Sequence, residues 1–256
     1  KSRSAGDYKN LIDLANELSS DSGRDIDPNQ VYIAGLSSGA SFANTTACLA
    51  PDVFAGVGVS AGPSVGTSSS GAIGPCEQAD VESRCRNLGG AYQSAFDTQV
   101  ASIAHGDADT TVNTCYNRQN AEGMAGLYGV SELSGSNTLN QDGGSAEEYL
   151  WQDGRVSMLW LNGLDHSWSG GQGASGSYIG SASINYARYL GEFFSNNNAR
   201  VDRNLAPSLS QVSATPDGDR IQVSGYADDE DGTVSRVDIV IDGLDGGGDS
   251  LTTGVD

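Results

Sequence analysis

The sequence predicts an α/β fold with a mainly parallel sheet, and three observations lead to this prediction. Short apolar segments rich in β-branched residues alternate with segments of helical periodicity as far as about residue 197. Glycine-rich turns follow several of the apolar segments. The hydrophobic content of 37% and the mean hydropathy of -0.33 are sufficient for a buried core in a globular chain. Strands that alternate with helices are typical of parallel sheets covered by helices.

The first half of this domain contains two predicted helices and two predicted strands. Residues 7–20 carry apolar residues at helical spacing, which predicts a helix. The segment VYIAG at 31–35 is short, apolar and β-branched, and so predicts a buried strand. Small residues follow it in a predicted helix at 38–50, and a second buried strand is expected at 54–60. Residues 62–97 are rich in Gly and Ser and are expected to form a long loop with one short helix.

The second half continues the same alternation. A strand is expected at 99–106 and a helix at 115–128. Residues 147–163 contain two apolar segments around Asp153-Gly154, which predicts a hairpin. Apolar residues at helical spacing predict a last helix at 180–196. The α/β domain is therefore assigned to residues 1–197.

The pattern changes after this domain. Residues 198–208 are polar and contain Asn, Arg and Pro, which is typical of a linker. Residues 209–256 contain three short alternating strands separated by turn residues, as in an antiparallel sandwich. Such a module needs about 100 residues, so we expect only part of an Ig-like or fibronectin-like module here.

The net charge excludes several kinds of partner. The chain has 33 acidic residues against 13 Lys and Arg, giving a formal charge of -20. A surface of this kind repels nucleic acid and anionic lipid. No apolar segment approaches the roughly 18 residues that a membrane helix needs. We therefore expect no nucleic-acid partner and no membrane partner, while the oligomeric state stays open.

The four cysteines indicate an oxidising compartment. Cys48, Cys76, Cys85 and Cys115 are an even and small number, as expected for two disulfides in a secreted protein. Cys76 and Cys85 bracket a short loop, which predicts the pairs Cys76–Cys85 and Cys48–Cys115. A zinc site is disfavoured because the chain has no CxxC and only two histidines. Four free thiols are the alternative.

Two GxSxG motifs occur, at 35–39 and at 58–62. With 35 glycines in the chain, a chance match is expected, so the motif alone is weak. A nucleophilic serine of this type needs a strand before it and a helix after it. Ser37 has both, whereas Gly-Pro-Ser follows Ser60. We therefore predict Ser37 as the nucleophile and the backbone N–H of Ser38 as an oxyanion donor.

A nucleophilic serine requires a base and an acid, which follow in the chain order Ser, Asp or Glu, His. His166 lies in a Gly-rich loop near the end of the domain, whereas His105 precedes the candidate acids. The order therefore selects His166. Asp107 and Asp109 both follow the strand at 99–106, and periodicity does not choose between them.

The segments VYIAGLSSGASFA, HGDADTTVN and DHSWSGG together resemble the extracellular poly(3-hydroxybutyrate) depolymerase-type esterases, over residues 7 to about 197. The resemblance implies an α/β-hydrolase fold related to feruloyl and acetylxylan esterases. It implies that Asp109 is the acid, because it matches the Asp of the family's HGxxDxxV motif. It also implies that Trp168 lines the substrate cleft, with a Trp packed in the core as the alternative.

One departure from the family concerns the oxyanion site. Family members have several strands before the nucleophile and a His-Gly turn that supplies a second oxyanion donor. Only about thirty residues precede the strand at 31–35 here, and none of them fits that turn. We expect the catalytic domain to be incomplete at its N-terminus, with a fragment of a longer product as the leading interpretation.

The resulting expectation is a secreted serine esterase that hydrolyses a neutral polyhydroxyalkanoate polyester and needs no cofactor. Feruloyl or acetyl esters of polysaccharides are the alternative substrates, and a non-catalytic adhesive protein is the alternative of another class. Clustered carboxylates beside a Gly turn at Asp228–Asp231 are a candidate calcium site. A solvated turn is the alternative there.

Overall fold

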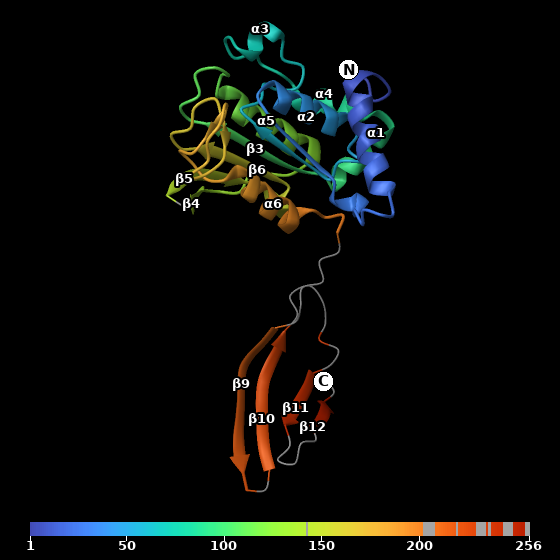
Figure 1. Ribbon diagram of the computed structural model, residues 1–256, viewed down its shortest axis with the longest axis vertical. Helices are drawn as coiled ribbons and strands as arrows, with labels where there is room; N and C mark the ends of the chain where they lie inside the picture. Colours follow the sequence, from blue (N-terminus) through green and yellow to red (C-terminus); the bar gives the residue numbers. More distant parts are fainter. Residues whose placement is uncertain are drawn as a thin grey trace. The chain divides into compact units, whose positions relative to one another are not determined.

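The computed structural model describes residues 1–141, 143–201, 208–218, 220–228, 234, 237–242 and 248–253. Two compact units are present, Lys1–Val201 and Asp202–Asp256, and Figure 1 shows the elements of each. The division falls inside the segment that the sequence predicts as a linker.

The first unit is built on a six-stranded sheet with the strand order β1-β2-β3-β6-β5-β4. The four strands β1, β2, β3 and β6 are parallel, and β5 and β4 continue the sheet in antiparallel fashion. The predicted hairpin is formed by β5 and β6, joined by η3 (Gln152–Gly154). The strand bounds are β1 Tyr32–Leu36, β2 Gly56–Ser60, β3 Val100–Gly106, β4 Asn137–Gln141, β5 Gly144–Leu150 and β6 Val156–Leu161.

Helices cover both faces of this sheet, which explains why β2 and β3 are buried along their whole length (Figure 1). On one face, Val57, Val59 and Ile103 pack with α2 (Ser38–Leu49) and α5 (Cys115–Tyr128). On the other face, Val100, Leu159 and Leu161 pack with α6 (Tyr186–Asn197). The alternation along each strand therefore divides the core into two layers, one on each side of the sheet.

The small residues of β2 are explained by α6. A Cβ added to Gly56 would lie 2.9 Å from the Phe194 ring, and one added to Gly58 would lie 2.8 Å from Leu190. The helix therefore packs directly on the strand backbone, and larger side chains would push it away. α6 begins at Tyr186, later than the predicted 180, because the Asn185 side chain accepts a hydrogen bond from Arg188 N and caps the helix.

The segment 62–97 has more helix than the sequence predicts. It contains α3 (Ser69–Ala72), α4 (Val81–Gly89) and η2 (Gly90–Asp97). α4 is capped by Asp80, whose side chain accepts from Ser83 N at 2.9 Å. Tertiary packing of α4 against α2 and α5 supports this helix although most of its side chains are polar or charged.

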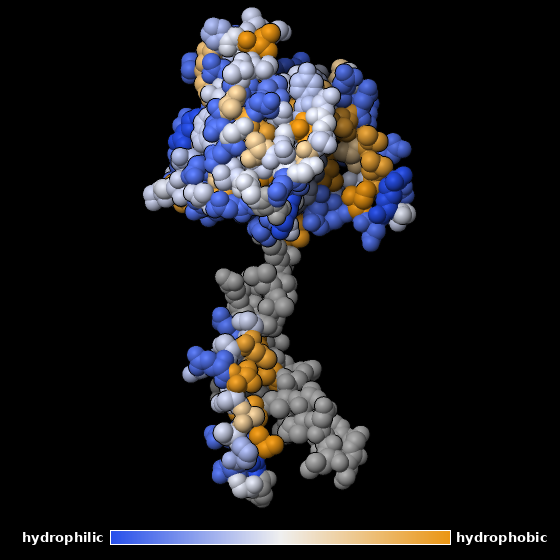
Figure 2. All heavy atoms as spheres, turned by 60° about the vertical axis from the view of Figure 1, so that its left-hand side comes forward, coloured by the Kyte–Doolittle hydropathy of each residue, from blue (hydrophilic) through white to orange (hydrophobic). Residues whose placement is uncertain are grey.

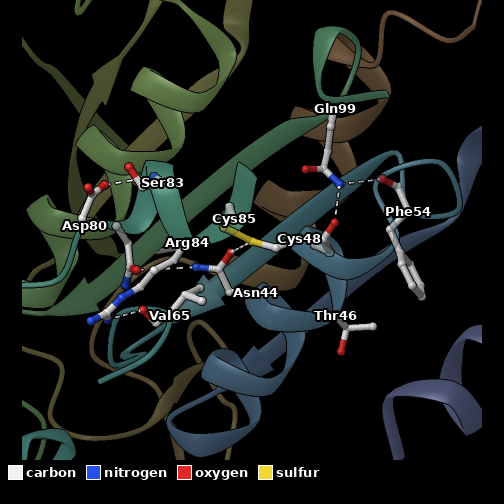
Figure 3. The surroundings of a disulfide bond; sticks show 12 residues. Asn44, Thr46, Cys48, Phe54, Val65, Asp80, Ser83, Arg84, Cys85 and Gln99 are labelled. Carbon is white, nitrogen blue, oxygen red and sulfur yellow. Dashed lines mark hydrogen bonds between the residues drawn. A yellow bond between two sulfur atoms is a disulfide. The ribbon is translucent and has the colours of Figure 1, made fainter. Parts of the chain in front are cut away.

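All four cysteines form disulfides, but the predicted pairing was wrong. The observed bonds join Cys48 to Cys85 and Cys76 to Cys115. Cys85 lies on the buried face of α4 and meets Cys48 of α2 (Figure 3). Because the helix turns Cys85 toward α2, proximity in sequence does not bring it to Cys76, which instead reaches the first residue of α5. The Cys48–Cys85 bond joins α2 to α4. The Cys76–Cys115 bond joins the loop before α4 to α5.

The remaining elements of the first unit lie at its periphery. α1 (Gly6–Ser20) buries Ile12 and confirms the predicted helix, and η1 (Pro28–Gln30) leads into β1. β7 (Trp168–Ser169) and β8 (Ile179–Gly180) form a small two-stranded sheet. The exposed strand β4 was missed because NTLNQ is polar and carries no apolar alternation. None of the helices among the described residues has the length and apolar character needed to cross a membrane.

The second unit contains antiparallel strand pairs. β9 (Ser208–Asp217) pairs with β10 (Arg220–Asp228), and β11 (Val237–Asp242) pairs with β12 (Gly248–Thr253). Figure 2 shows apolar residues gathered along β9 and β10. Exposed apolar side chains of these two strands are Leu209, Val212, Ile221, Val223 and Tyr226. Antiparallel strands are confirmed here, whereas the Ig-like character of the module stays a prediction.

Candidate active site

Ser37 lies in a sharp turn between β1 and α2, as the sequence predicts. Its backbone has φ 58 and ψ -122, a left-handed conformation that costs free energy in a residue with a side chain. The turn is held by Ser37 N, which donates to Ser60 O at 2.8 Å. A Cβ on Gly35 would lie 2.4 Å from the backbone of Gly39, so only glycine lets the strand and the helix approach this closely. This geometry is that of a nucleophile elbow.

The second GxSxG motif has a different structure. Ser60 is the last residue of β2, is only 1% exposed, and has a buried Oγ without a hydrogen-bond partner among the described residues. A buried hydroxyl at this position has no access to a substrate. The structure therefore separates the two motifs in the way that their flanking residues predict.

Three side chains far apart in sequence meet beyond the carboxyl ends of three parallel strands. Ser37 follows β1, Asp109 follows β3, and His166 follows β6. His166 Nε2 lies 2.9 Å from Ser37 Oγ, and His166 Nδ1 lies 2.8 Å from Asp109 Oδ2. The carboxyl edge of a parallel sheet is where ligands bind in open α/β folds.

The loops that carry Asp109 and His166 are joined to each other. Ala108 N donates to Leu164 O at 3.1 Å, and Gly163 N donates to Asp107 Oδ1 at 2.7 Å. A Cβ on Gly106 would lie 2.1 Å from Leu164 O, so this close approach requires glycine. The structure thus distinguishes the two candidate acids, since Asp107 supports the loop while Asp109 faces the imidazole.

The hydrogen bonds define the proton positions. An ionised carboxylate only accepts, so His166 Nδ1 carries the proton that is shared with Asp109. His166 Nε2 then has a free lone pair and accepts the Ser37 hydroxyl proton. In this arrangement the imidazole can remove a proton from Ser37 while Asp109 stabilises the imidazolium that results.

Asp109 is ionised in the folded protein. Burial of the carboxyl opposes ionisation, but hydrogen bonds from His105, His166 and the amides of Thr111 and Val112 outweigh it and hold the pKa of Asp109 well below its usual range. The amides of Thr111 and Val112 donate to Oδ1 at 2.7 and 3.1 Å. The Asp109 side chain is fully buried, so these donors replace water.

His105, which chain order rejects as the base, also contacts the acid. Its Nε2 lies 3.0 Å from Asp109 Oδ2, and its side chain is 1% exposed. Sequence reasoning missed this contact. The four-residue spacing between His105 and Asp109 across the end of a strand is the signal that was present.

A cleft of about 700 Å³ opens above Ser37 and His166. Its lining combines hydroxyl groups with the apolar surfaces of Leu36 and Tyr178, and the sequence identified neither Tyr178 nor the threonines. Tyr178 is 70% exposed and has φ 59. The lining residues are Leu36, Ser37, Ser38, Thr110, Thr111, Asp165, His166, Ser167 and Tyr178.

Trp168 is placed differently from the expectation. It is not among the residues that line this cleft, and its ring packs on Tyr186 with a centroid separation of 5.2 Å. It is partly buried and packs against the core layer that contains the buried residues of α6. This packing against Tyr186 agrees with the alternative interpretation of a Trp packed on the core.

Ser38 is the first residue of α2 and lines the cleft beside Ser37. Its backbone N–H belongs to the first turn of a helix, where amides have no partner within the helix and favour negative charge. This is the chemical character that an oxyanion donor requires. The structure therefore places the predicted residue at the appropriate position, and its role stays a proposal.

No group of three or more His, Cys, Asp or Glu side chains among the described residues is arranged to hold a metal ion. The candidate calcium site at Asp228–Asp231 falls largely outside that part of the chain, because residues 229–231 are not among the described residues. Asp228 itself ends β10.

A family model for the esterase PHB depolymerases matches residues 4–148, more than half of the chain. The chain belongs to this esterase family. It is 33% identical over 224 residues to a poly(3-hydroxybutyrate) depolymerase of Ralstonia pickettii, covering 85% of this chain and 45% of that protein. It is 26% identical over 185 residues to poly(3-hydroxyalkanoate) depolymerase C of Paucimonas lemoignei, covering 66% and 44%. The chain therefore spans less than half the length of these curated relatives.

Two solved structures resemble the fold of this family member. The acetyl xylan esterase from Aspergillus awamori has a TM-score of 0.57 at 19% identity, over 75% of this chain and 69% of that one. The PHB depolymerase from Penicillium funiculosum has a TM-score of 0.51 at 18% identity, over 75% and 57%. These similarities support the α/β-hydrolase-like fold that the sequence predicts.

Proposed function

We propose that this protein is a secreted serine esterase that hydrolyses polyhydroxyalkanoate polyester through Ser37, His166 and Asp109. The observation that carries the proposal is the continuous chain of hydrogen bonds from Ser37 Oγ through His166 to Asp109, at 2.9 and 2.8 Å. Family membership adds independent support.

The first half of the reaction forms an acyl-enzyme. Ser37 Oγ attacks the ester carbonyl carbon while His166 Nε2 takes the hydroxyl proton. The oxyanion of the tetrahedral intermediate accepts a hydrogen bond from Ser38 N–H at the start of α2. The C–O bond of the ester then breaks, and His166 returns the proton to the leaving alcohol oxygen.

The second half releases the acid. Water enters the position of the alcohol and gives a proton to His166 as its oxygen attacks the acyl carbon. The bond from that carbon to Ser37 Oγ breaks, and His166 returns the proton to Ser37. No atom changes its oxidation state in this reaction. His166 carries every proton that is transferred.

The cleft and the charge of the chain fit a neutral ester. Tyr178 and Leu36 offer apolar surface to methyl and methylene groups, while Thr110, Thr111 and Ser167 offer hydroxyl groups to ester oxygens. A neutral polymer is not repelled by a chain with a formal charge of -20. The relatives from Ralstonia pickettii and Paucimonas lemoignei are named for polyesters of this class.

The cellular location and the second unit also belong to the proposal. The two disulfides support an extracellular location, since such bonds persist in oxidising compartments. The antiparallel strand pairs after residue 208 support a partial Ig-like or fibronectin-like module that follows the catalytic domain.

The test is hydrolysis of a poly(3-hydroxybutyrate) suspension and of methyl ferulate by the wild type, Ser37→Ala and Ser60→Ala. We expect the wild type to clear the polymer suspension and Ser37→Ala to lose at least about a thousandfold in kcat. Ser60→Ala is the matched control, because it removes the serine of the other GxSxG motif while its backbone bond to Ser37 N remains.

The alternatives give different results. Cleavage of methyl ferulate without clearing of the polymer would retain the mechanism and move the substrate to polysaccharide esters. Activity that survives Ser37→Ala would contradict the assignment of the nucleophile. An inactive wild type that also fails to react with a serine-directed phosphonate would favour a non-catalytic binding protein.

A further inference from the structure

We infer that His105 is a positioning residue for the acid of the site: its Nε2–H fixes Asp109 Oδ2 in the orientation that serves His166. This inference rests on the proposed function, since it assigns a second histidine to the same proton-transfer chain. His105 is otherwise an unexplained buried imidazole at the end of β3, directly before Gly106.

The geometry places both imidazoles on one oxygen atom. His105 Nε2 lies 3.0 Å and His166 Nδ1 lies 2.8 Å from Asp109 Oδ2. The other oxygen, Oδ1, accepts the amides of Thr111 and Val112. A carboxylate has about four acceptor positions. All four are used, so each donor restricts rotation of the carboxylate about its Cβ–Cγ bond.

The protonation state of His105 follows from its surroundings. Because the carboxylate only accepts, Nε2 must carry the proton. Nδ1 is buried and has no hydrogen-bond partner among the described residues. Protonation of Nδ1 would leave a buried N–H without an acceptor, which is costly. Nε2 of His105 is therefore the donor to Asp109, and the buried Nδ1 has no serine hydroxyl within reach among the described residues.

Among the residues that the structure describes, Asp109 is the hydrogen-bond partner of the His105 side chain. On the adjacent strand β6, its register partner is Trp160, and its side chain points to the same face of the sheet as Ile103, beneath α2 and α5. The other carboxylates on the two loops already have partners, since Asp107 accepts from Gly163 N and Asp165 accepts from Ser167 Oγ. Asp109 is the charged group that faces His105.

The sharing of Oδ2 has a kinetic consequence. A donor from His105 withdraws electron density from the oxygen that also stabilises the imidazolium of His166. Loss of this donor leaves Oδ2 to His166 alone, so the protonated imidazole becomes more stable in the resting enzyme. We therefore expect the acidic limb of the pH–rate profile to move to higher pH, in addition to a fall in rate from the less restricted carboxylate.

The experiment compares His105→Leu, His105→Gln and His105→Asn in the full chain. Leu has no donor, Gln carries its Nε2 amide close to the position of the imidazole Nε2, and the Asn amide is too short to reach Oδ2. The readout is the rate of phosphonylation of Ser37 by a fluorophosphonate as a function of pH, followed by mass spectrometry. This readout does not depend on the identity of the ester.

For His105→Leu and His105→Asn we expect an about tenfold slower plateau rate and an acidic limb about 0.5 pH unit higher. His105→Gln should restore most of the plateau rate and most of the wild-type position of the acidic limb. Circular dichroism and the midpoint of thermal unfolding identify any variant that fails to fold. If His105→Leu fails to fold, the comparison of His105→Gln with His105→Asn still tests the inference. A slower rate with an unmoved limb would indicate a purely structural residue and overturn the inference.

Failure of the inference can be distinguished from failure of the proposed function. Labelling at Ser37 with wild-type rates and profiles in all three variants would overturn the role of His105 alone. Absence of labelling at Ser37 in the wild type would overturn the proposed function and this inference together. Ser37→Ala, which should not be labelled, is the control for the site of reaction.

Discussion

Asp109 is the residue on which the hydrogen bonds of the site converge. Its two oxygens accept two imidazole donors and two backbone amides, and its side chain is fully buried. Such a carboxylate stabilises the fold only while it is ionised. Catalysis and stability should therefore both depend on the protonation of this one group.

The pH dependence of stability tests this dependence at Asp109. The pKa of Asp109 is lower in the folded protein than in the unfolded chain, where it is about 3.9. Its contribution is therefore present above about pH 4 and is lost as the pH falls toward the folded pKa. Below about pH 4, the free energy of unfolding of the wild type should fall relative to that of Asp109→Asn by about 1.4 kcal/mol for each pH unit.

Urea unfolding from pH 2 to pH 7 measures this difference. Asp107→Asn, in the same loop, is the control for a general effect of changing a carboxylate there. Parallel profiles for the wild type and Asp109→Asn would show that the hydrogen-bonded carboxylate does not contribute in this way.

At the scale of elements, the site depends on how closely β1 approaches α2. The turn that exposes Ser37 exists because Gly35 has no Cβ and the backbone of Gly39 passes directly over it. The strand supplies its last residues to the sheet, and the helix supplies the amide of Ser38. A change in the packing of these two elements should therefore affect both stability and the nucleophile.

Gly35→Ala should be severely destabilising, and Gly39→Ala should not. A Cβ on Gly35 would lie 2.4 Å from Gly39 backbone atoms, whereas one on Gly39 would meet nothing within 4 Å. We expect Gly35→Ala to lower the free energy of unfolding by about 3 kcal/mol or more and to abolish phosphonate labelling of Ser37. Gly39→Ala should be neutral or slightly stabilising, since Ala is favoured over Gly in helices.

Thermal unfolding and phosphonate labelling of the two variants provide the comparison. Equal behaviour of the two alanines would mean that the helix and the strand can separate without loss of the elbow. That result would remove the packing argument for Gly35.

At the scale of the molecule, the first unit is completed by residues that follow α6. Asn198 Nδ2 donates to Asn29 O at 2.8 Å and to Tyr32 Oη at 2.7 Å. The Arg200 guanidinium donates to Thr98 Oγ1 and to the carbonyls of Pro51 and Ala95. These contacts join the end of the unit to β1 and to the loop before β2, so the unit extends to Val201.

Truncation tests this boundary. A chain of residues 1–201 should retain hydrolysis of a soluble ester and unfold within a few degrees of the full chain. A chain of residues 1–197, which ends at the boundary predicted from sequence, loses the hydrogen bonds of Asn198 and Arg200. It should unfold at a temperature lower by about 5 °C or more. Equal unfolding temperatures of the two chains would show that residues 198–201 do not stabilise the unit.

The sequence by itself determined the features that depend on local pattern. Strands β1, β2, β3, β5 and β6 follow from short apolar segments, and α1, α2 and α5 follow from helical periodicity or small-residue segments. Ser37 follows from a strand, a glycine-flanked serine and a helix in succession. Chain order selected His166 as the base, and the resemblance to the depolymerase-type esterases selected Asp109 over Asp107 as the acid. The structure brings both residues together with Ser37. β4 and the start of α6 were not predicted, because one is polar and the other depends on the Asn185 cap.

Tertiary structure alone decided the features that depend on what meets across the sheet. The disulfides pair Cys48 with Cys85 because α4 turns Cys85 toward α2, a direction that sequence separation does not contain. Trp168 packs against the core at Tyr186, whereas Tyr178, ten residues later, lines the cleft. His105 contacts Asp109 because the chain turns directly after β3, where Asp109 N donates to Gly106 O. Sequence pattern specifies which face of an element is apolar, whereas the partners of its polar atoms are specified only when the elements pack.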